Sequence, residues 1–73
     1  MNHRQKNQRI AALEVENWNL KHRVGDTVTV LKDNGDIVPT TTRSAAEITA
    51  SGHAVIWLTG ISGYYMLDRV TAI

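Results

Sequence analysis

The segment best suited to chemistry is residues 40–44, in which three threonines are followed by one arginine and one serine. Ser44 followed three residues later by Glu47 has the pattern of a capping box, which predicts a short helix starting there. A helix start exposes free N–H groups and partial positive charge, and arginine adds a fork that suits phosphate. We therefore expect Thr42, Arg43 and Ser44 to bind an anionic ligand. The alternative is structural: the threonines favour a strand, Ser44 only caps the helix, and Arg43 pairs with an acidic side chain.

Two further side chains are candidates for the same ligand site. His53 follows Gly52 at the start of an apolar segment, where it either hydrogen-bonds a ligand or closes the loop. Tyr64 and Tyr65 are neighbours in a strand-like segment, so they point to opposite faces. Tyr65 shares its face with Leu67 and is expected in the core, which leaves Tyr64 free to stack on a base or to pack at an interface.

Familiar catalytic patterns are missing from the sequence. There is no cysteine, no Gly-x-Ser-x-Gly elbow, no phosphate loop and no Gly-x-Gly-x-x-Gly segment. His3, His22 and His53 share no metal-ligand spacing. We therefore expect neither an enzyme, nor a metal site, nor a cofactor.

One element that must position these residues is an N-terminal helix. Residues 3–22 contain no glycine or proline and many good helix formers, and Val24-Gly25-Asp26 ends the helical pattern. At 73 residues the chain has room for one small core, so we divide it into a helix over 1–23 and a small β domain over 24–73.

The helix carries a stripe of apolar residues with the three-and-four spacing of a coiled coil, with Asn17 at an a position. Glu16 at g and Lys21 at e have the spacing of a parallel pair. Trp18 lies off the stripe and is expected to pack on the β domain. The stripe then either contacts a partner chain or forms core within the chain. Its residues are Ile10, Leu13, Asn17, Leu20 and Val24.

The remaining residues predict short antiparallel strands. Residues 27–31 alternate in polarity, and Asn34-Gly35 predicts a type I′ turn into a return strand over 37–42, where Pro39 indicates an edge or a bulge. Residues 53–59 are apolar on both faces and predict either a central strand buried on both sides or a strand with its second face at an oligomer interface, followed by strands over 64–67 and 68–73. The predicted fold is α+β and mainly β: a helix, then a small twisted antiparallel sheet or SH3-like barrel with one short helical insertion.

Composition narrows the class of partner. Hydrophobic residues make up 42% of the chain, which is typical of a globular domain, and a core this small favours a homo-oligomer. Net charge is only +1, but residues 1–23 hold five Lys or Arg against two Glu. That helix is either a solvated face or a nucleic-acid contact with steep salt dependence, and the missing basic groove argues against the latter.

Without an apolar span, secretory signal or cysteine, we expect a cytoplasmic protein and no membrane partner.

Several short segments, in their order along nearly the whole chain, resemble small proteins encoded by tailed bacteriophages and prophages. These segments are Trp18-Asn19, Val24-Gly25 followed by Val28 and Val30, Thr42-Arg43-Ser44, Gly52-His53, and the ending Gly60-x-x-Gly63-Tyr64-x-x-Leu67-x-x-Val70.

The resemblance implies an infected bacterial host and the setting of phage counter-defence, where one class of small proteins sequesters cyclic or ADP-ribose-like nucleotides. We therefore expect a non-enzymatic anti-defence protein that binds a nucleotide immune messenger through Thr42, Arg43, Ser44, His53 and Tyr64. The alternative is an interaction module that oligomerises through its N-terminal helix and inhibits or recruits a host protein.

Overall fold

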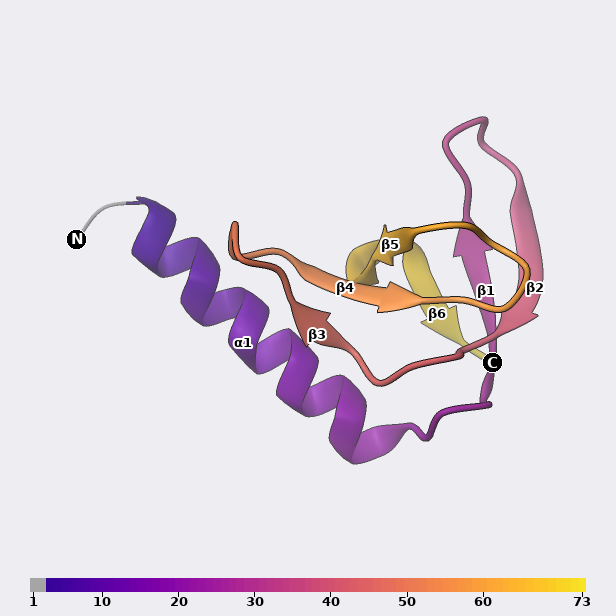
Figure 1. The fold of residues 1–73 in the computed structure, drawn as a ribbon, viewed down its shortest axis with the longest axis horizontal. Helices are drawn as coiled ribbons and strands as arrows, with labels where there is room; N and C mark the ends of the chain where they lie inside the picture. Colours follow the sequence, from indigo (N-terminus) through magenta and orange to yellow (C-terminus); the bar gives the residue numbers. More distant parts are fainter. Residues whose placement is uncertain (1–2) are drawn as a thin grey trace.

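The computed structural model describes residues 3–73, with side chains from residue 9 onward, as one helix followed by short strands (Figure 1). The elements in chain order are α1 His3–Lys21, β1 Thr27–Leu31, β2 Ile37–Thr41, β3 Glu47–Ile48, β4 Ala54–Trp57, β5 Tyr64–Met66, the 3-10 turn η1 Leu67–Arg69 and β6 Val70–Ala72.

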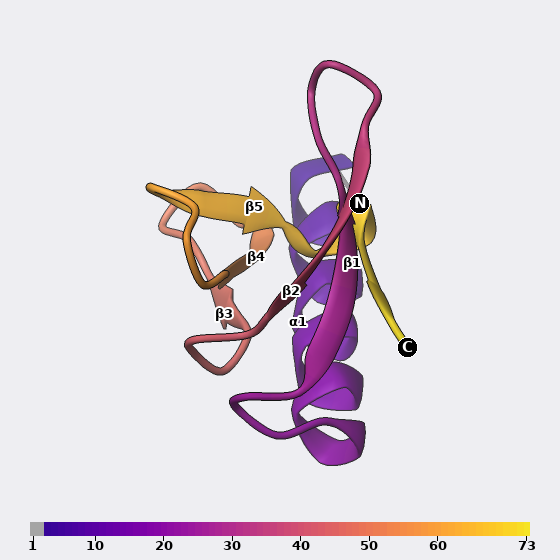
Figure 2. The same ribbon diagram turned by 90° about the vertical axis from the view of Figure 1, so that its right-hand side faces the viewer.

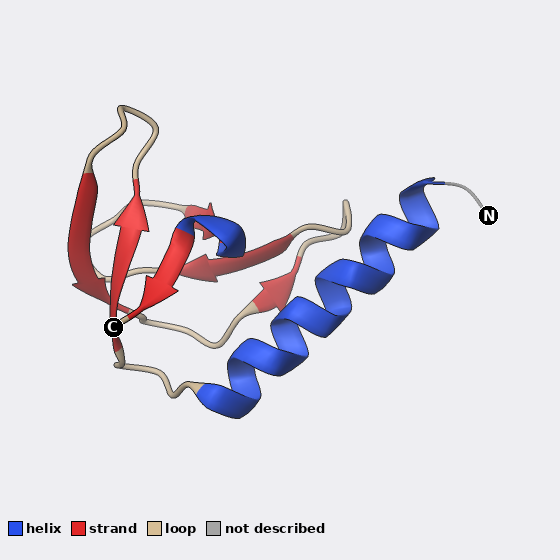
Figure 3. Cartoon of the chain, turned by 180° about the vertical axis from the view of Figure 1, so that it is seen from behind, coloured by secondary structure: helices blue, strands red, loops and turns tan. Residues whose placement is uncertain are grey.

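Helix α1 lies along one side of the strands, next to β3 and β4 (Figures 1 and 3). Ala11 is buried in the main core, and Val15 and Trp18 are packed against that core. These three residues recur at steps of four and three, so they share one helix face. The predicted helix and the predicted packing of Trp18 on the β domain are both confirmed.

The strands form two antiparallel sheets, with strand orders β2-β1-β6 and β3-β4-β5. The strands of one sheet run across those of the other (Figure 2). In β1, Val28 and Val30 are fully buried while the residues between and beside them are not, as the alternating sequence predicts. In β4, Val55 and Ile56 point to opposite faces and are both fully buried, which confirms a central strand covered on both sides.

The sheets meet where β2 and β4 end. Thr42 forms an isolated antiparallel bridge with Leu58, and the Thr59 N–H donates to the Thr41 carbonyl at 2.9 Å. No continuous ladder closes the described strands into a barrel. The architecture is therefore α+β and mainly strand, made of one helix and two small antiparallel sheets.

The predicted helical insertion at Ser44 is wrong. Residues 44–46 are irregular, and Glu47–Ile48 form β3, which pairs with Val55 and Ala54 of β4. The Ser44 hydroxyl, expected to cap a helix, instead accepts a hydrogen bond from the Trp57 N–H at 3.1 Å. Pairing with β4, the next strand along the chain, has prevailed over the capping signal.

The predicted type I′ turn is also wrong. Gly35 has φ +91°, but no non-glycine residue of the described chain has a positive φ, so Asn34 cannot supply the first left-handed position. The Asn34 side chain instead accepts the Asp36 N–H at 3.0 Å. The Lys32 N–H donates to the Asp36 carbonyl at 2.8 Å, which closes a loop with one left-handed glycine.

Candidate functional site

Thr42, the first residue of the predicted anion site, is buried and holds the linker between α1 and β1. Its hydroxyl accepts the Gly25 N–H at 3.0 Å and donates to the Arg23 carbonyl at 3.3 Å. Its main chain also bonds to Gly25 and to Asp26, at 2.9 and 3.1 Å. Both the donor and an acceptor position of this hydroxyl are used inside the fold.

Arg43 lies beside the end of β4 and binds main-chain carbonyl groups. Its N–H donates to the Trp57 carbonyl at 3.0 Å, while Nε donates to the Leu58 carbonyl at 3.0 Å and Nη2 to the Ile61 carbonyl at 3.4 Å. The Arg43 guanidinium thus binds main-chain carbonyls and not the acidic side chain that the alternative interpretation predicts. The guanidinium therefore holds the loop that follows β4, although the side chain is exposed.

Thr42, Arg43 and Ser44 do come together, as a continuous segment along the end of β4. However, the helix start that was expected to supply N–H groups and positive charge is absent. What remains of the predicted anion site is one exposed arginine whose fork already binds two carbonyls. Ligand binding by these residues stays a prediction.

Tyr64 belongs to β5, which flanks the end of β4 on the side opposite Arg43. It pairs with Trp57 of β4. The two rings meet edge to face, with centroids 5.7 Å apart. Tyr64 is exposed and borders a shallow hollow of about 400 Å³ with Ile61, Ser62 and Arg69 among its walls. Tyr65 packs against the core, so the expected division of the two tyrosines is confirmed.

His53 lies before the start of β4, at the other end of this strand from Arg43 and Tyr64. Its N–H donates to the Thr49 hydroxyl at 3.1 Å, and its carbonyl accepts the Thr49 N–H at 2.9 Å. The main chain of His53 thus closes the loop between β3 and β4, as the structural alternative expects. The five predicted ligand residues do not converge on one cavity.

The outer stripe, defined here as Ile10, Leu13, Asn17 and Leu20, lies on the exposed side of α1, where Asn17 also borders a groove between α1 and η1. The exposed fractions of Ile10, Leu13 and Leu20 are 46%, 57% and 78%. Asn17 is also exposed. The alternative in which this stripe forms core within the chain is therefore wrong. An apolar stripe with this spacing, left in solvent by its own domain, is the largest exposed apolar feature of the helix.

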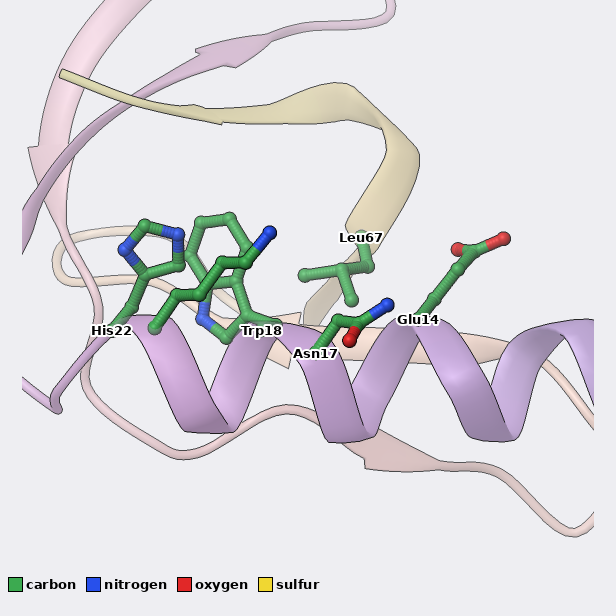
Figure 4. A pocket seen from close by; sticks show the side chains of 6 residues that line it. Glu14, Asn17, Trp18, His22 and Leu67 are labelled. Atoms are coloured by element: carbon green, nitrogen blue, oxygen red, sulfur yellow. The ribbon is translucent and has the colours of Figure 1, made fainter.

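A shallow groove of about 300 Å³ runs between α1 and η1 (Figure 4). Trp18 forms its floor, with the His22 ring 4.2 Å away and Leu67 opposite. Glu14, Asn17 and Lys21 complete the wall on the helix side. Sequence analysis missed this groove, although residues 14, 18 and 22 follow each other at steps of four and so must line one edge of the helix.

The described residues contain no cluster of three or more His, Asp or Glu side chains that could hold a metal ion. From Arg9 onward, no buried side-chain nitrogen or oxygen lacks a hydrogen-bond partner. Surface features of this part of the chain thus include the outer stripe, the groove beside it, the hollow at Tyr64 and a hollow of about 480 Å³ lined by His22, Asp26, Thr27, Ala72 and Ile73.

No family model, curated protein or solved structure matches this chain. Between residues 3 and 73, no helix combines the length and apolar character needed to cross a membrane.

Proposed function

We propose that this chain is a non-enzymatic protein–protein interaction module, encoded by a bacteriophage and acting in the cytoplasm of the infected host. In this proposal α1 contacts the partner protein, and the β domain is the folded unit attached to this helix. The phage setting comes from the sequence resemblance alone. The interaction role is supported by one structural observation, the division of α1 into two faces.

The inner face of α1 is held against its own domain. Trp18 and Val15 pack on the core, and Asn19 makes two hydrogen bonds to the main chain of Ala46. Because these contacts fix the rotation of the helix, the opposite face must stay in solvent. A helix needed only for folding gains nothing from leucines there, since burying one leucine contributes about 1.5–3 kcal/mol.

We also propose that the β domain is a small open barrel of the SH3-like kind. Three features support this arrangement: the Thr42–Leu58 bridge joins the sheets, a 3-10 turn directly precedes the last strand, and that strand returns to pair with β1. Such a barrel is a rigid scaffold for loops, and the hollow at Tyr64 lies between two of these loops.

The experiment that tests the interaction role is site-specific photo-crosslinking in bacteria. Leu13 is replaced by a benzophenone amino acid, and the matched control places the same amino acid at Thr71, an exposed residue of β6. We expect discrete crosslinked protein products from position 13, abolished by Leu20→Glu. An absence of products above those of the Thr71 control would contradict the proposal.

Nucleotide sequestration stays a prediction from the sequence resemblance. The loss of the helix start removes its main physical support, and the engaged fork of Arg43 weakens the rest. We therefore rank it below the interaction role.

A further inference from the structure

We propose that the outer stripe pairs with the outer stripe of a second copy as a parallel, two-stranded coiled coil. This inference rests on the proposed function, because it names the partner of the same helix face.

The placement of the β domain on α1 leaves the coiled-coil seam free. With Ile10 at position a, the residues that pack on the domain or bond to it fall at b, c and f, which point away from a partner helix, while Asn17 at a and Glu14 and Lys21 at e only border the groove beside η1. The packed or bonded residues are Ala11 and Trp18 at b, Val15 and His22 at f, and Asn19 at c. Two copies can therefore join at a and d with their β domains on the outer sides.

The seam residues favour two strands. A β-branched residue at a with leucine at d is the combination typical of dimers, and here Ile10 is at a while Leu13 and Leu20 are at d. All three side chains are substantially exposed, so pairing removes apolar surface that the single chain leaves in water.

The charges that flank the seam are complementary between copies. In a parallel pair, each g residue faces the e residue five positions later in the partner. Arg9 then faces Glu14 of the second copy, and Glu16 faces Lys21 of the second copy. Among the side chains that the structure describes, from Arg9 onward, none of these four residues forms an ion pair. Each copy thus has two free g–e pairs to offer.

Asn17 selects the parallel orientation. In a parallel pair the a position faces a, so the two Asn17 side chains meet and can hydrogen-bond to each other. In the antiparallel pair that aligns the seam, where Ile10 meets Leu20, Asn17 instead faces Leu13. That arrangement buries an amide against an apolar side chain, which costs free energy. Asn17 therefore favours the parallel pair over the antiparallel one.

Orientation can be tested with single cysteines, because the chain has none of its own. Leu20→Cys places two thiols side by side in a parallel pair. In the antiparallel pair they lie about 15 Å apart, ten residues at 1.5 Å each. Ile10→Cys serves for the mixed test, and Ala12→Cys, exposed on the helix at position c, is the matched control. All three sites are on the helix surface, and circular dichroism verifies that the variants fold.

We expect Leu20→Cys to form a disulfide-linked dimer under mild oxidation at least tenfold faster than Ala12→Cys. Preferential linkage of Ile10→Cys to Leu20→Cys in an equal mixture would overturn the parallel arrangement. Equal, slow oxidation of all variants would overturn self-pairing altogether. Crosslinks from Leu13 to a host protein would then leave the interaction role standing without the dimer, so the two proposals can fail separately.

Discussion

Asn19 and Ala46 are joined by a closed pair of hydrogen bonds across 27 positions of the chain. The Asn19 amide donates to the Ala46 carbonyl at 3.1 Å, and the Ala46 N–H donates to Asn19 Oδ1 at 2.9 Å. The Asn19 side chain thus bonds to Ala46 as the main chain of a neighbouring strand would, and it holds α1 against the segment before β3. This contact fixes which face of the helix meets the domain, and therefore which face remains outside.

Removing the Asn19 amide is expected to loosen this attachment. Asn19→Ala leaves the N–H and carbonyl of buried Ala46 without these partners, and we expect a loss of about 1–2 kcal/mol in the free energy of unfolding. Urea denaturation measures it. Asn17→Ala, two residues away on the outer stripe, is the matched control and should leave the stability of the single chain nearly unchanged. Equal effects from the two variants would contradict the assigned faces.

Trp18 is expected to contribute most to the packing of α1 on the domain. Because it is partly rather than fully buried, we expect Trp18→Ala to cost about 2–3 kcal/mol, somewhat less than the largest core truncations. Thermal unfolding followed by circular dichroism is the measurement. Trp18→Phe keeps an aromatic ring and should retain more than half of this stability. A Trp18→Ala protein as stable as the parent would show that the helix is not docked.

Arg43 is expected to act on stability rather than on ligand capture. Arg43→Ala removes two hydrogen bonds to the loop after β4, and since the side chain is exposed we expect a loss of about 1 kcal/mol. Arg43→Lys should recover only part, because lysine lacks the planar fork.

The same variant tests nucleotide binding. Native mass spectra are recorded for the parent and for Arg43→Ala with cyclic di- and trinucleotides and cyclic ADP-ribose isomers. We expect no adduct that depends on Arg43. A ligand retained by the parent and lost by a folded Arg43→Ala would restore the sequestration hypothesis over the interaction role.

The sequence predicted those elements whose side-chain periodicity is continuous. Helix α1, the alternation in β1 and the doubly buried β4 follow from spacing alone, because each pattern repeats over several residues. The outer stripe was also visible as spacing, but its exposure was not. The exposure of the outer stripe depends on Trp18 and Asn19, which attach the other face of the helix to the β domain. These attachments are contacts between segments that are distant in the sequence.

The local capping signal failed where the following strand, β4, competed for the same atoms. Ser44 and Glu47 match a capping box, yet the Ser44 hydroxyl binds the Trp57 N–H and Glu47 pairs with Val55. The helix start that was expected to support the anion site is therefore absent, and ligand binding by Thr42, Arg43 and Ser44 stays a prediction. Nothing in the spacing of Arg43 indicated that its fork would meet the carbonyls of Leu58 and Ile61. Such carbonyls are placed by the fold rather than by sequence neighbours.

The proposed pairing of two copies requires the outer stripe of α1 to be a contact surface. Sedimentation equilibrium over a wide concentration range tests it most directly, comparing the parent with Leu13→Glu/Leu20→Glu. We predict a parent mass that rises with concentration from 8.1 kDa towards twice that value, and a variant that stays at 8.1 kDa with unchanged circular dichroism. A parent that remains a monomer at millimolar concentration, or a variant that associates as the parent does, would contradict the proposed pairing.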